Sequence, residues 1–242
     1  MKNRLIPHDR SVIVAADVDN ALQARRLANA MKGVPRISGY KVGFELGLLG
    51  LATVTASIRD VSEDTVIIYD QQKAGTDIPK MGPRFAKRIK GAGCDGAILF
   101  PFAGPETQTV WTKSCQDAGL RVLVGGVMTH PKFLVSEGGY IADDAPERIF
   151  KLACEQGVTD FVVPGTKLEW VKKLRATLLK ELGEGNFVLY APGLIDQGGD
   201  ITECGLAAGP YFHGIIGEGI YGKSTEEAMH TAALAATQKL AT

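Results

Sequence analysis

The chain has 242 residues, of which 45% are hydrophobic and 22% are charged, as is usual for a globular protein. Lys and Arg together number 27, and Asp and Glu also number 27, so the balanced charge argues against a nucleic-acid-binding chain. No stretch of 18 apolar residues predicts a membrane span, and the first ten residues lack the apolar core of a signal peptide. The four widely spaced cysteines indicate reduced thiols, so we expect a cytoplasmic protein.

Short β-branched runs alternate with longer amphipathic stretches along the whole chain. Eight apolar runs predict strands, and they begin at Ser11, Arg36, Thr65, Asp95, Arg121, Asp160, Asn186 and Phe212. Their starts are 25 to 30 residues apart, apart from one interval of 39, and each interval holds one strand, one helix and two turns. Because these runs are apolar nearly throughout, they are typical of parallel strands that are buried on both faces.

Between the predicted strands, apolar residues recur at helical spacing and predict helices. Leu168, Val171, Leu174 and Leu178 form one stripe, with Gly183 as the predicted cap. The last helix is expected to begin at Ser224, which is followed by a glutamate three residues later in a capping-box pattern. The 39-residue interval indicates either an enlarged loop at 129–147 or an extra short helix within it.

Eight regular units favour a closed parallel eight-stranded (β/α)8 TIM barrel with outer helices over an open doubly wound sheet. The chain has no low-complexity linker, so we predict a single (β/α)8 barrel domain spanning residues 1–242. In such a barrel the active site lies at the carboxyl ends of the strands.

Charged residues close the first three predicted strands. Asp17 follows the first run, Lys41 lies inside the second, and Asp70, Lys73 and Asp77 follow the third. A buried salt bridge between Asp17 and Lys41 explains the first pair equally well, but several alternating charges at one barrel mouth indicate a ligand or a reaction. A lysine between carboxylates keeps its proton and can deliver it to a carbanion, while a carboxylate facing a substrate carboxylate destabilises that group before it leaves as carbon dioxide.

Glycines follow the seventh and eighth strands. Gly193, Gly198 and Gly199 occur in one loop, and Gly217 and Gly219 occur in the other. The loops after strands 7 and 8 are the usual phosphate site of this barrel, so the two loops together predict phosphate binding. His130 and His213 lack metal-ligand spacing, and no metal site is predicted.

At this point the chain resembles the orotidine 5′-phosphate decarboxylase family over essentially its full length. The resemblance is carried, in order, by VIVAADV, GYKVGFELG, IIYDQQKAGTDIP, VGGVMTHP, APGLIDQGGD and IIGEGIYG. It implies decarboxylation of orotidine 5′-monophosphate to uridine 5′-monophosphate in pyrimidine biosynthesis, with no metal or organic cofactor. The implied partners are a nucleotide monophosphate and a second copy of the chain, in a homodimer with shared active sites.

The resemblance also implies catalytic roles. Lys73 is expected to protonate carbon 6 of the pyrimidine, and Asp70 to press on the substrate carboxylate and help hold Lys73. Asp77 is expected to reach into the partner's site, and Lys41 to join the charge network.

The same resemblance implies a set of substrate-binding residues. Asp17 and Lys41 are expected to bind ribose hydroxyls, and Thr129 to stand where the family commonly has a serine that touches the base. The remaining implied binding residues are Pro192, Gln197, Gly198, Gly217 and Glu218.

Two departures from the family pattern accompany this resemblance. The family reads D-x-K-x-x-D, whereas Asp70, Lys73 and Asp77 read D-x-x-K-x-x-x-D, so a bulge or a loop starting at Gln71 is needed to direct the lysine inward. The family reads Gly-Arg where this chain reads Gly-Glu218, and two like charges about 4 Å apart cost roughly 4 kcal/mol at an effective dielectric of 20. Either Glu218 turns outward and leaves the anion to backbone groups and Lys223, or the natural ligand differs.

Two other functions stay open from the residues alone. One is a metal-dependent sugar-phosphate lyase or aldolase on the same barrel, and the other is a non-catalytic nucleotide-binding barrel.

Overall fold

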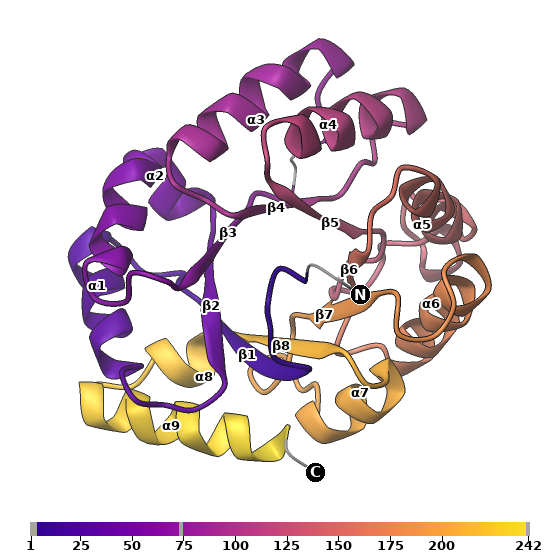
Figure 1. The fold of residues 1–242 in the computed structure, drawn as a ribbon. Helices are drawn as coiled ribbons and strands as arrows, with labels where there is room; N and C mark the ends of the chain where they lie inside the picture. The colour runs from indigo at the N-terminus through magenta and orange to yellow at the C-terminus, as the bar shows by residue number, and fades with distance from the viewer. Residues whose placement is uncertain (1–3, 73–74, 241–242) are drawn as a thin grey trace.

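The computed structural model describes residues 4–72 and 75–240, in which eight parallel strands close into one ring. The strands are β1 Arg10–Ala15, β2 Ile37–Val42, β3 Val66–Asp70, β4 Gly96–Leu99, β5 Arg121–Gly125, β6 Asp160–Val162, β7 Val188–Ala191 and β8 Phe212–Ile216. Each strand pairs with its neighbours in chain order, and β8 closes the ring against β1 (Figure 1). The predicted barrel is therefore confirmed, and each strand lies within two residues of the predicted start of its run.

Helices surround the ring of strands (Figure 1). The α-helices are α1 Ala21–Ala30, α2 Phe44–Arg59, α3 Gly82–Gly91, α4 Pro105–Asp117, α5 Ala145–Glu155, α6 Leu168–Glu181, α7 Ile201–Ala208, α8 Glu218–Tyr221 and α9 Glu226–Lys239. Two short 3-10 helices, η1 Pro79–Met81 and η2 Val135–Glu137, lie in the loops after β3 and β5. None of the helices in the described part of the chain is long and apolar enough to cross a membrane.

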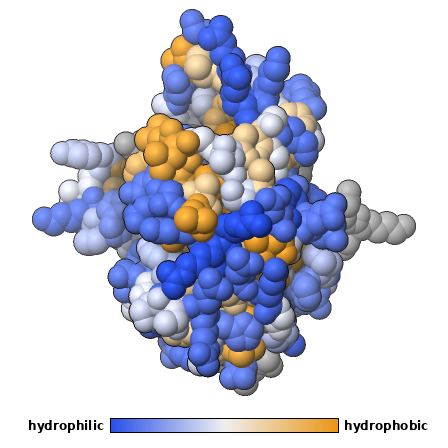
Figure 2. Space-filling view, turned by 90° about the vertical axis from the view of Figure 1, so that its left-hand side faces the viewer, coloured by the Kyte–Doolittle hydropathy of each residue, from blue (hydrophilic) through white to orange (hydrophobic). Residues whose placement is uncertain are grey.

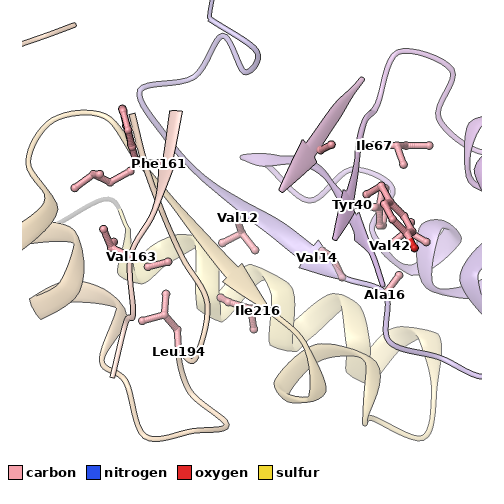
Figure 3. Close-up of a cluster of buried hydrophobic side chains, with 14 of the residues drawn as sticks. Val12, Val14, Ala16, Tyr40, Val42, Ile67, Phe161, Val163, Leu194 and Ile216 are labelled. Carbon is pink, nitrogen blue, oxygen red and sulfur yellow. The ribbon is translucent and has the colours of Figure 1, made fainter. Parts of the chain in front are cut away.

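Side chains of β1 illustrate how the barrel sorts its apolar residues. Ile13 and Ala15 belong to the cluster inside the ring, whereas Val12 and Val14 belong to the layer between the strands and the helices (Figure 3). This alternation is the period of two that a strand imposes on its side chains. Because both sets are buried, the sequence run is continuously apolar.

The N-terminal segment lies across the ring of strands (Figure 1). Ile6 is fully buried and packs with the interior cluster. Arg4 stacks its guanidinium 4.6 Å from the ring centroid of Tyr211, just before β8, and pairs with Asp9 at 2.6 Å. These contacts hold the segment against the amino-terminal end of the barrel, so the opposite end is left for the site.

Two helix predictions are refined by the structure. Val171, Leu174 and Leu178 are fully buried, and Gly183 adopts φ +80° and donates its N–H to Leu179, as a helix-ending glycine does. The fourth residue of the predicted stripe, Leu168, is only partly buried because it lies at the first turn.

The predicted N-cap of the last helix is wrong by one residue. Thr225, rather than Ser224, has extended backbone and accepts the N–H of Ala228 at 3.1 Å. The backbone carbonyl of Ser224 instead accepts a hydrogen bond from Arg26 of α1 at 2.7 Å. This tertiary contact, which no local pattern reveals, fixes the residue before the cap.

The long interval after β5 contains both features that the sequence left open. The segment 126–144 is an enlarged loop, and η2 lies within it. Lys167, which precedes α6, pairs with Glu137 at 2.8 Å and donates to the carbonyl of His130 at 3.2 Å. Two anchored points therefore hold this loop beside the mouth of the barrel.

Candidate functional site

A cavity of about 740 Å³ opens at the carboxyl ends of the strands. Its walls come from the ends of β1, β2 and β3 on one side and from the loops after β5, β7 and β8 on the other. Eight of the residues predicted from the sequence line it, namely Asp17, Lys41, Asp70, Thr129, Pro192, Gln197, Gly217 and Glu218. The fold therefore brings together residues from both ends of the chain, such as Asp17 and Glu218.

The other three predicted site residues are not among the described residues that line this cavity. Lys73 lies outside the described residues. Gly198 adopts φ +87° in the loop after β7 but does not line the cavity. Asp77 is exposed, accepts the N–H of Ile78 at 2.6 Å through its carboxylate, and does not contribute to the cavity of its own chain.

Lys41 lies between two carboxylates at the floor of the cavity. Its Nζ is 3.2 Å from Oδ1 of Asp17 and 3.2 Å from Oδ2 of Asp70. The side chains of Lys41 and Asp70 are only 11% and 7% exposed, whereas that of Asp17 is 40% exposed. The predicted pairing of Asp17 with Lys41 is thus present, and Asp70 extends it into a three-residue network.

The strand register explains this network. Ala15 of β1 pairs with Lys41 of β2, so Asp17, two residues further along, reaches the same level above the strands. Lys41 in turn pairs with Ile68 of β3, and Asp70 again follows two residues later. Side chains two apart on neighbouring parallel strands point to the same face, which places both carboxylates beside the ammonium.

Gly43 leaves room for the network at the start of α2. A Cβ atom there would lie 2.9 Å from Oδ1 of Asp17 and 3.9 Å from Nζ of Lys41. Any larger residue would displace the Asp17 carboxylate, so the glycine is required by close approach.

Burial and charge act in opposite directions on this network. Burial by itself would lower the pKa of Lys41, but Asp70 and Asp17 outweigh it and hold that pKa above its ordinary value. Burial raises the pKa of Asp70, the ion pair with Lys41 opposes this rise, and the negative charge of Asp17 adds to it. The Lys41 ammonium therefore keeps its proton. For Asp70, the attraction of Lys41 does not fully offset the effect of burial, so the pKa of this carboxyl stays above its ordinary value.

Within the described chain, the hydrogen bonding of Asp70 is also incomplete at one of its two carboxylate oxygens. Its Oδ1 atom is buried, and none of the residues that the structure describes donates a hydrogen bond to it. A buried carboxylate oxygen without a donor is unfavourable by about 1–3 kcal/mol or more, so this atom is poised to accept a further donor.

The opposite wall is shaped by the loop after β7. Gly193 adopts φ +85°, and a Cβ atom there would meet Thr166, Gln197 and Thr129 at 3.0–3.1 Å. The carbonyl of Gly193 accepts the N–H of Gly199 at 3.1 Å, which folds the loop back on itself. The tight turn brings the side chains of Gln197 and Thr129 together at the cavity wall.

The loop after β8 leads directly into α8. Gly217 precedes the helix, its carbonyl accepts the N–H of Tyr221 at 3.1 Å, and Glu218 is the first helical residue. Lys223 follows α8, is exposed, and does not line the cavity.

Several cavity residues were not predicted from the sequence. They include Phe44, Glu45, Tyr69, Gln71, Asp196 and Tyr221. Asp196 lies inside the PGLIDQGGD stretch, and its position beside Gln197 is the sequence signal that indicates its place in the cavity. Tyr221 likewise lies inside the IIGEGIYG stretch, and it lines the cavity from the end of α8.

β3 ends at Asp70, so the loop begins at Gln71, as the unusual spacing requires. The Tyr69 hydroxyl donates to Oε1 of Gln71 at 2.8 Å, which fixes the first residue of the loop beside the strand.

The chain is similar to several known proteins that carry the same name. No family model matches the chain. A protein named orotidine 5′-phosphate decarboxylase from Methanosarcina mazei is 29% identical over 210 residues, which cover 87% of this chain and 87% of that protein. A protein of the same name from Methanococcoides burtonii is 29% identical over 221 residues, which cover 91% of this chain and 90% of that protein.

Solved structures agree on the fold. A crystal structure of orotidine 5′-monophosphate decarboxylase from Methanocaldococcus jannaschii with the inhibitor BMP covers 97% of this chain and 100% of its own, with TM-score 0.81 and 21% identity. The orotidine 5′-phosphate decarboxylase structure from Pyrococcus horikoshii covers 96% and 99%, with TM-score 0.75 and 24% identity. The resemblance predicted from the sequence is therefore confirmed.

Proposed function

We propose that this chain, which belongs to the orotidine 5′-phosphate decarboxylase family, converts orotidine 5′-monophosphate to uridine 5′-monophosphate and carbon dioxide in pyrimidine biosynthesis. The observation that carries the proposal is the charge network at the cavity floor. There Lys41 joins Asp17 and Asp70, and one Asp70 oxygen receives no hydrogen bond from residues 4–72 or 75–240. No cofactor is part of the proposal, because charged side chains can supply the required electrostatics.

The reaction breaks the bond between carbon 6 and the carboxylate of the substrate. Asp70, which lines the cavity, is proposed to face that carboxylate, and its negative charge would raise the energy of the bound substrate more than that of the departing neutral carbon dioxide. The bonding electron pair stays on carbon 6. Lys73, three residues after Asp70, is proposed to donate its ammonium proton to that carbon. Its positive charge would complement the Asp70 oxygen that has no donor within the described part of the chain.

The other proposed contacts follow the walls of the cavity. Asp17 and Lys41 would bind the ribose hydroxyls, and Thr129 and Pro192 would contact the base. Gln197 and the backbone of Gly217 would bind the phosphate, with Gly198 shaping the loop and Glu218 bordering it.

We also propose a homodimer with shared active sites. Asp77 lies outside its own cavity, next to Ile78, whose side chain is 50% exposed. Phe44 and Leu48 of α2 line the cavity and are 58% and 83% exposed. Apolar groups are exposed on the face that carries α1 and α2 (Figure 2), and a second copy would cover such groups near the mouth.

Two further expectations stay proposals. Residues 1–242 act as one domain, since the cavity takes residues from strands near both ends of the chain. The protein works in the cytoplasm, where its four unpaired cysteines would remain reduced.

The first test is turnover of orotidine 5′-monophosphate, followed by loss of the ultraviolet absorbance of the substrate. The wild type is expected to turn over, and Lys73→Ala to lower kcat by about 10²–10⁴-fold. Lys172→Ala removes an exposed lysine of α6 that pairs with Glu169 and should leave kcat unchanged. Intact substrate after incubation with the wild type, checked by mass spectrometry, would overturn the proposal. Turnover of a sugar phosphate that is lost with a chelator would favour the lyase alternative, and binding of uridine 5′-monophosphate without turnover would favour the non-catalytic one.

Shared sites are tested by mixing two inactive variants. Asp70→Ala and Asp77→Ala are each expected to be nearly inactive. If Asp77 serves the partner's cavity, half of the sites in a heterodimer carry both aspartates, so a refolded equimolar mixture recovers about a quarter of wild-type activity. No recovery, with mixed dimers verified by native mass spectrometry, would show that Asp77 does not act across the interface.

A further inference from the structure

Two carboxylates border the end of the cavity that is formed by the loops after β7 and β8. Asp196 and Glu218 both line this end. A Cβ atom on Gly219 would lie 2.9 Å from Oδ1 of Asp196, so this carboxylate packs against the first turn of α8, where Glu218 begins. The two loops expected to receive a phosphate therefore present negative charge to it.

The phenol of Tyr221 is influenced by both of these carboxylates. Burial raises the pKa of the Tyr221 phenol, and Asp17, Glu218 and Asp196 each raise it further, whereas Lys41 lowers it. One side chain therefore experiences three carboxylates and one ammonium from four separate elements.

Positive charge is scarce at this end. Among the cavity-lining residues that the structure describes, Lys41 supplies the cationic side chain, and its ammonium already contacts Asp17 and Asp70 at 3.2 Å each. Arg26 of α1 does not line the cavity; it donates to the backbone of Ser224 at 2.7 Å and pairs with Glu226 at 3.7 Å. The exposed Lys223 is not part of the cavity wall.

The hydrogen-bonding groups left for a phosphate are neutral. Gln197 and Thr129 meet at Gly193, and Tyr221 and Gly217 also line this end of the cavity. Neutral donors stabilise a dianion less than charged donors do. They are well matched to an anion of single charge.

A phosphate monoester changes its charge near neutral pH. Its second pKa is about 6, so the monoanion and the dianion are both accessible between pH 6 and pH 8. The dianion only accepts hydrogen bonds, and a carboxylate beside it is repulsive. The monoanion carries one P–OH group, which can donate a hydrogen bond to a carboxylate oxygen.

Resting on the proposed function, we propose that Glu218, together with Asp196, makes this pocket bind the 5′-phosphate of its nucleotide as the monoanion, with the phosphate P–OH donating to the Glu218 carboxylate. Glu218 is then a specificity-determining residue that selects the protonation state of the ligand. Affinity follows the fraction of monoanion, which falls about 50-fold between pH 6 and pH 8.

The experiment measures the Kd of uridine 5′-monophosphate by titration calorimetry at pH 6, 7 and 8, with uridine as the ligand that lacks the phosphate. Wild-type Kd for the nucleotide is expected to rise about 50-fold over this range, while that for uridine stays constant. Glu218→Gln is expected to lower the Kd at pH 8 at least tenfold and to flatten the profile, and Glu218→Arg to reverse it. Glu227→Gln removes an equal charge from an exposed position in α9 outside the cavity and should keep the wild-type profile.

A wild-type Kd that stays constant or falls from pH 6 to pH 8 would overturn the inference, as would a Glu218→Gln profile identical to that of the wild type. Undetectable binding of the nucleotide at every pH would overturn it as well. Turnover of orotidine 5′-monophosphate is measured on the same samples. A flat binding profile with turnover refutes only the inference, and the expected profile without turnover refutes only the proposed function.

Discussion

Replacing Lys41 with methionine tests whether the network at the cavity floor stabilises the fold as well as the site. The substitution keeps the volume of the stem and removes the ammonium, so Asp70, with 7% of its side chain exposed, loses its ion pair with Lys41. At a separation of 3.2 Å, one pair of unit charges attracts by about 5 kcal/mol at an effective dielectric of 20. The Asp17 pair contributes less, because 40% of that side chain is exposed to water.

Desolvation of the ammonium offsets part of this attraction. Removing one partner of a buried pair is typically unfavourable by about 3–5 kcal/mol, because the remaining charge is left uncompensated. For a chain of this length, that loss corresponds to a fall in Tm of about 6–20 °C. We expect Lys41→Met to show this fall at pH 7 in thermal and urea unfolding.

The pH dependence gives the sharper test. Burial already raises the pKa of Asp70, and loss of Lys41 removes the interaction that opposes this rise. The folded variant therefore holds a proton on Asp70 that the unfolded chain releases above about pH 4. Stability of Lys41→Met relative to the wild type should fall as the pH rises from 4 to 7, and most of the deficit should vanish at pH 4.

Two comparisons complete this test. Lys41→Met/Asp70→Asn leaves no buried carboxylate at position 70 and should recover at least half of the lost stability. Lys113→Met removes a lysine that pairs with Asp117 on the surface, with 73% and 63% of these side chains exposed, and should change stability by less than about 0.5 kcal/mol. Equal stability of Lys41→Met and the wild type, or no recovery in the double variant, would refute the reasoning.

Three further predictions concern the scaffold. Burial lowers the pKa of His213 to about 3, so this neutral histidine contributes stability above pH 6.5 that is lost as the pH falls toward 3. In urea unfolding, the free energy of unfolding of His213→Gln should therefore fall less steeply between pH 6 and pH 4 than that of the wild type. An unchanged slope would contradict this account. A Cβ atom on Gly125 would lie 2.2 Å from the ring of the phenylalanine that follows β4, so Gly125→Ala should lower the free energy of unfolding by about 1–3 kcal/mol. A Cβ atom on Gly91 would meet nothing within 4 Å, so Gly91→Ala should raise it by about 0.5–1 kcal/mol in the same assay. Thr225→Ala should lose about 1 kcal/mol through its missing cap while Ser224→Ala changes Tm little, and the reverse order would restore the N-cap predicted from the sequence.

The amino-acid sequence by itself determined the elements and their order. A strand that is covered on both faces must be apolar nearly throughout, so β1 and β8 were recognisable as runs, and Lys41 stood out because a charge inside such a run needs a partner. The family resemblance rested on the same local stretches. Residues that touch the site within those stretches, such as Asp17 and Gln197, were therefore predictable.

Only the tertiary structure decided which distant groups meet. The closure of β8 on β1 joins Ser11 to His213 through a buried hydrogen bond of 2.7 Å, although these residues are 202 positions apart. The same closure turns Tyr221 toward Asp17 across the mouth of the barrel. Sequence periodicity reports whether a side chain is buried, but it carries no information about the partner, because that partner is fixed by strand register and barrel closure.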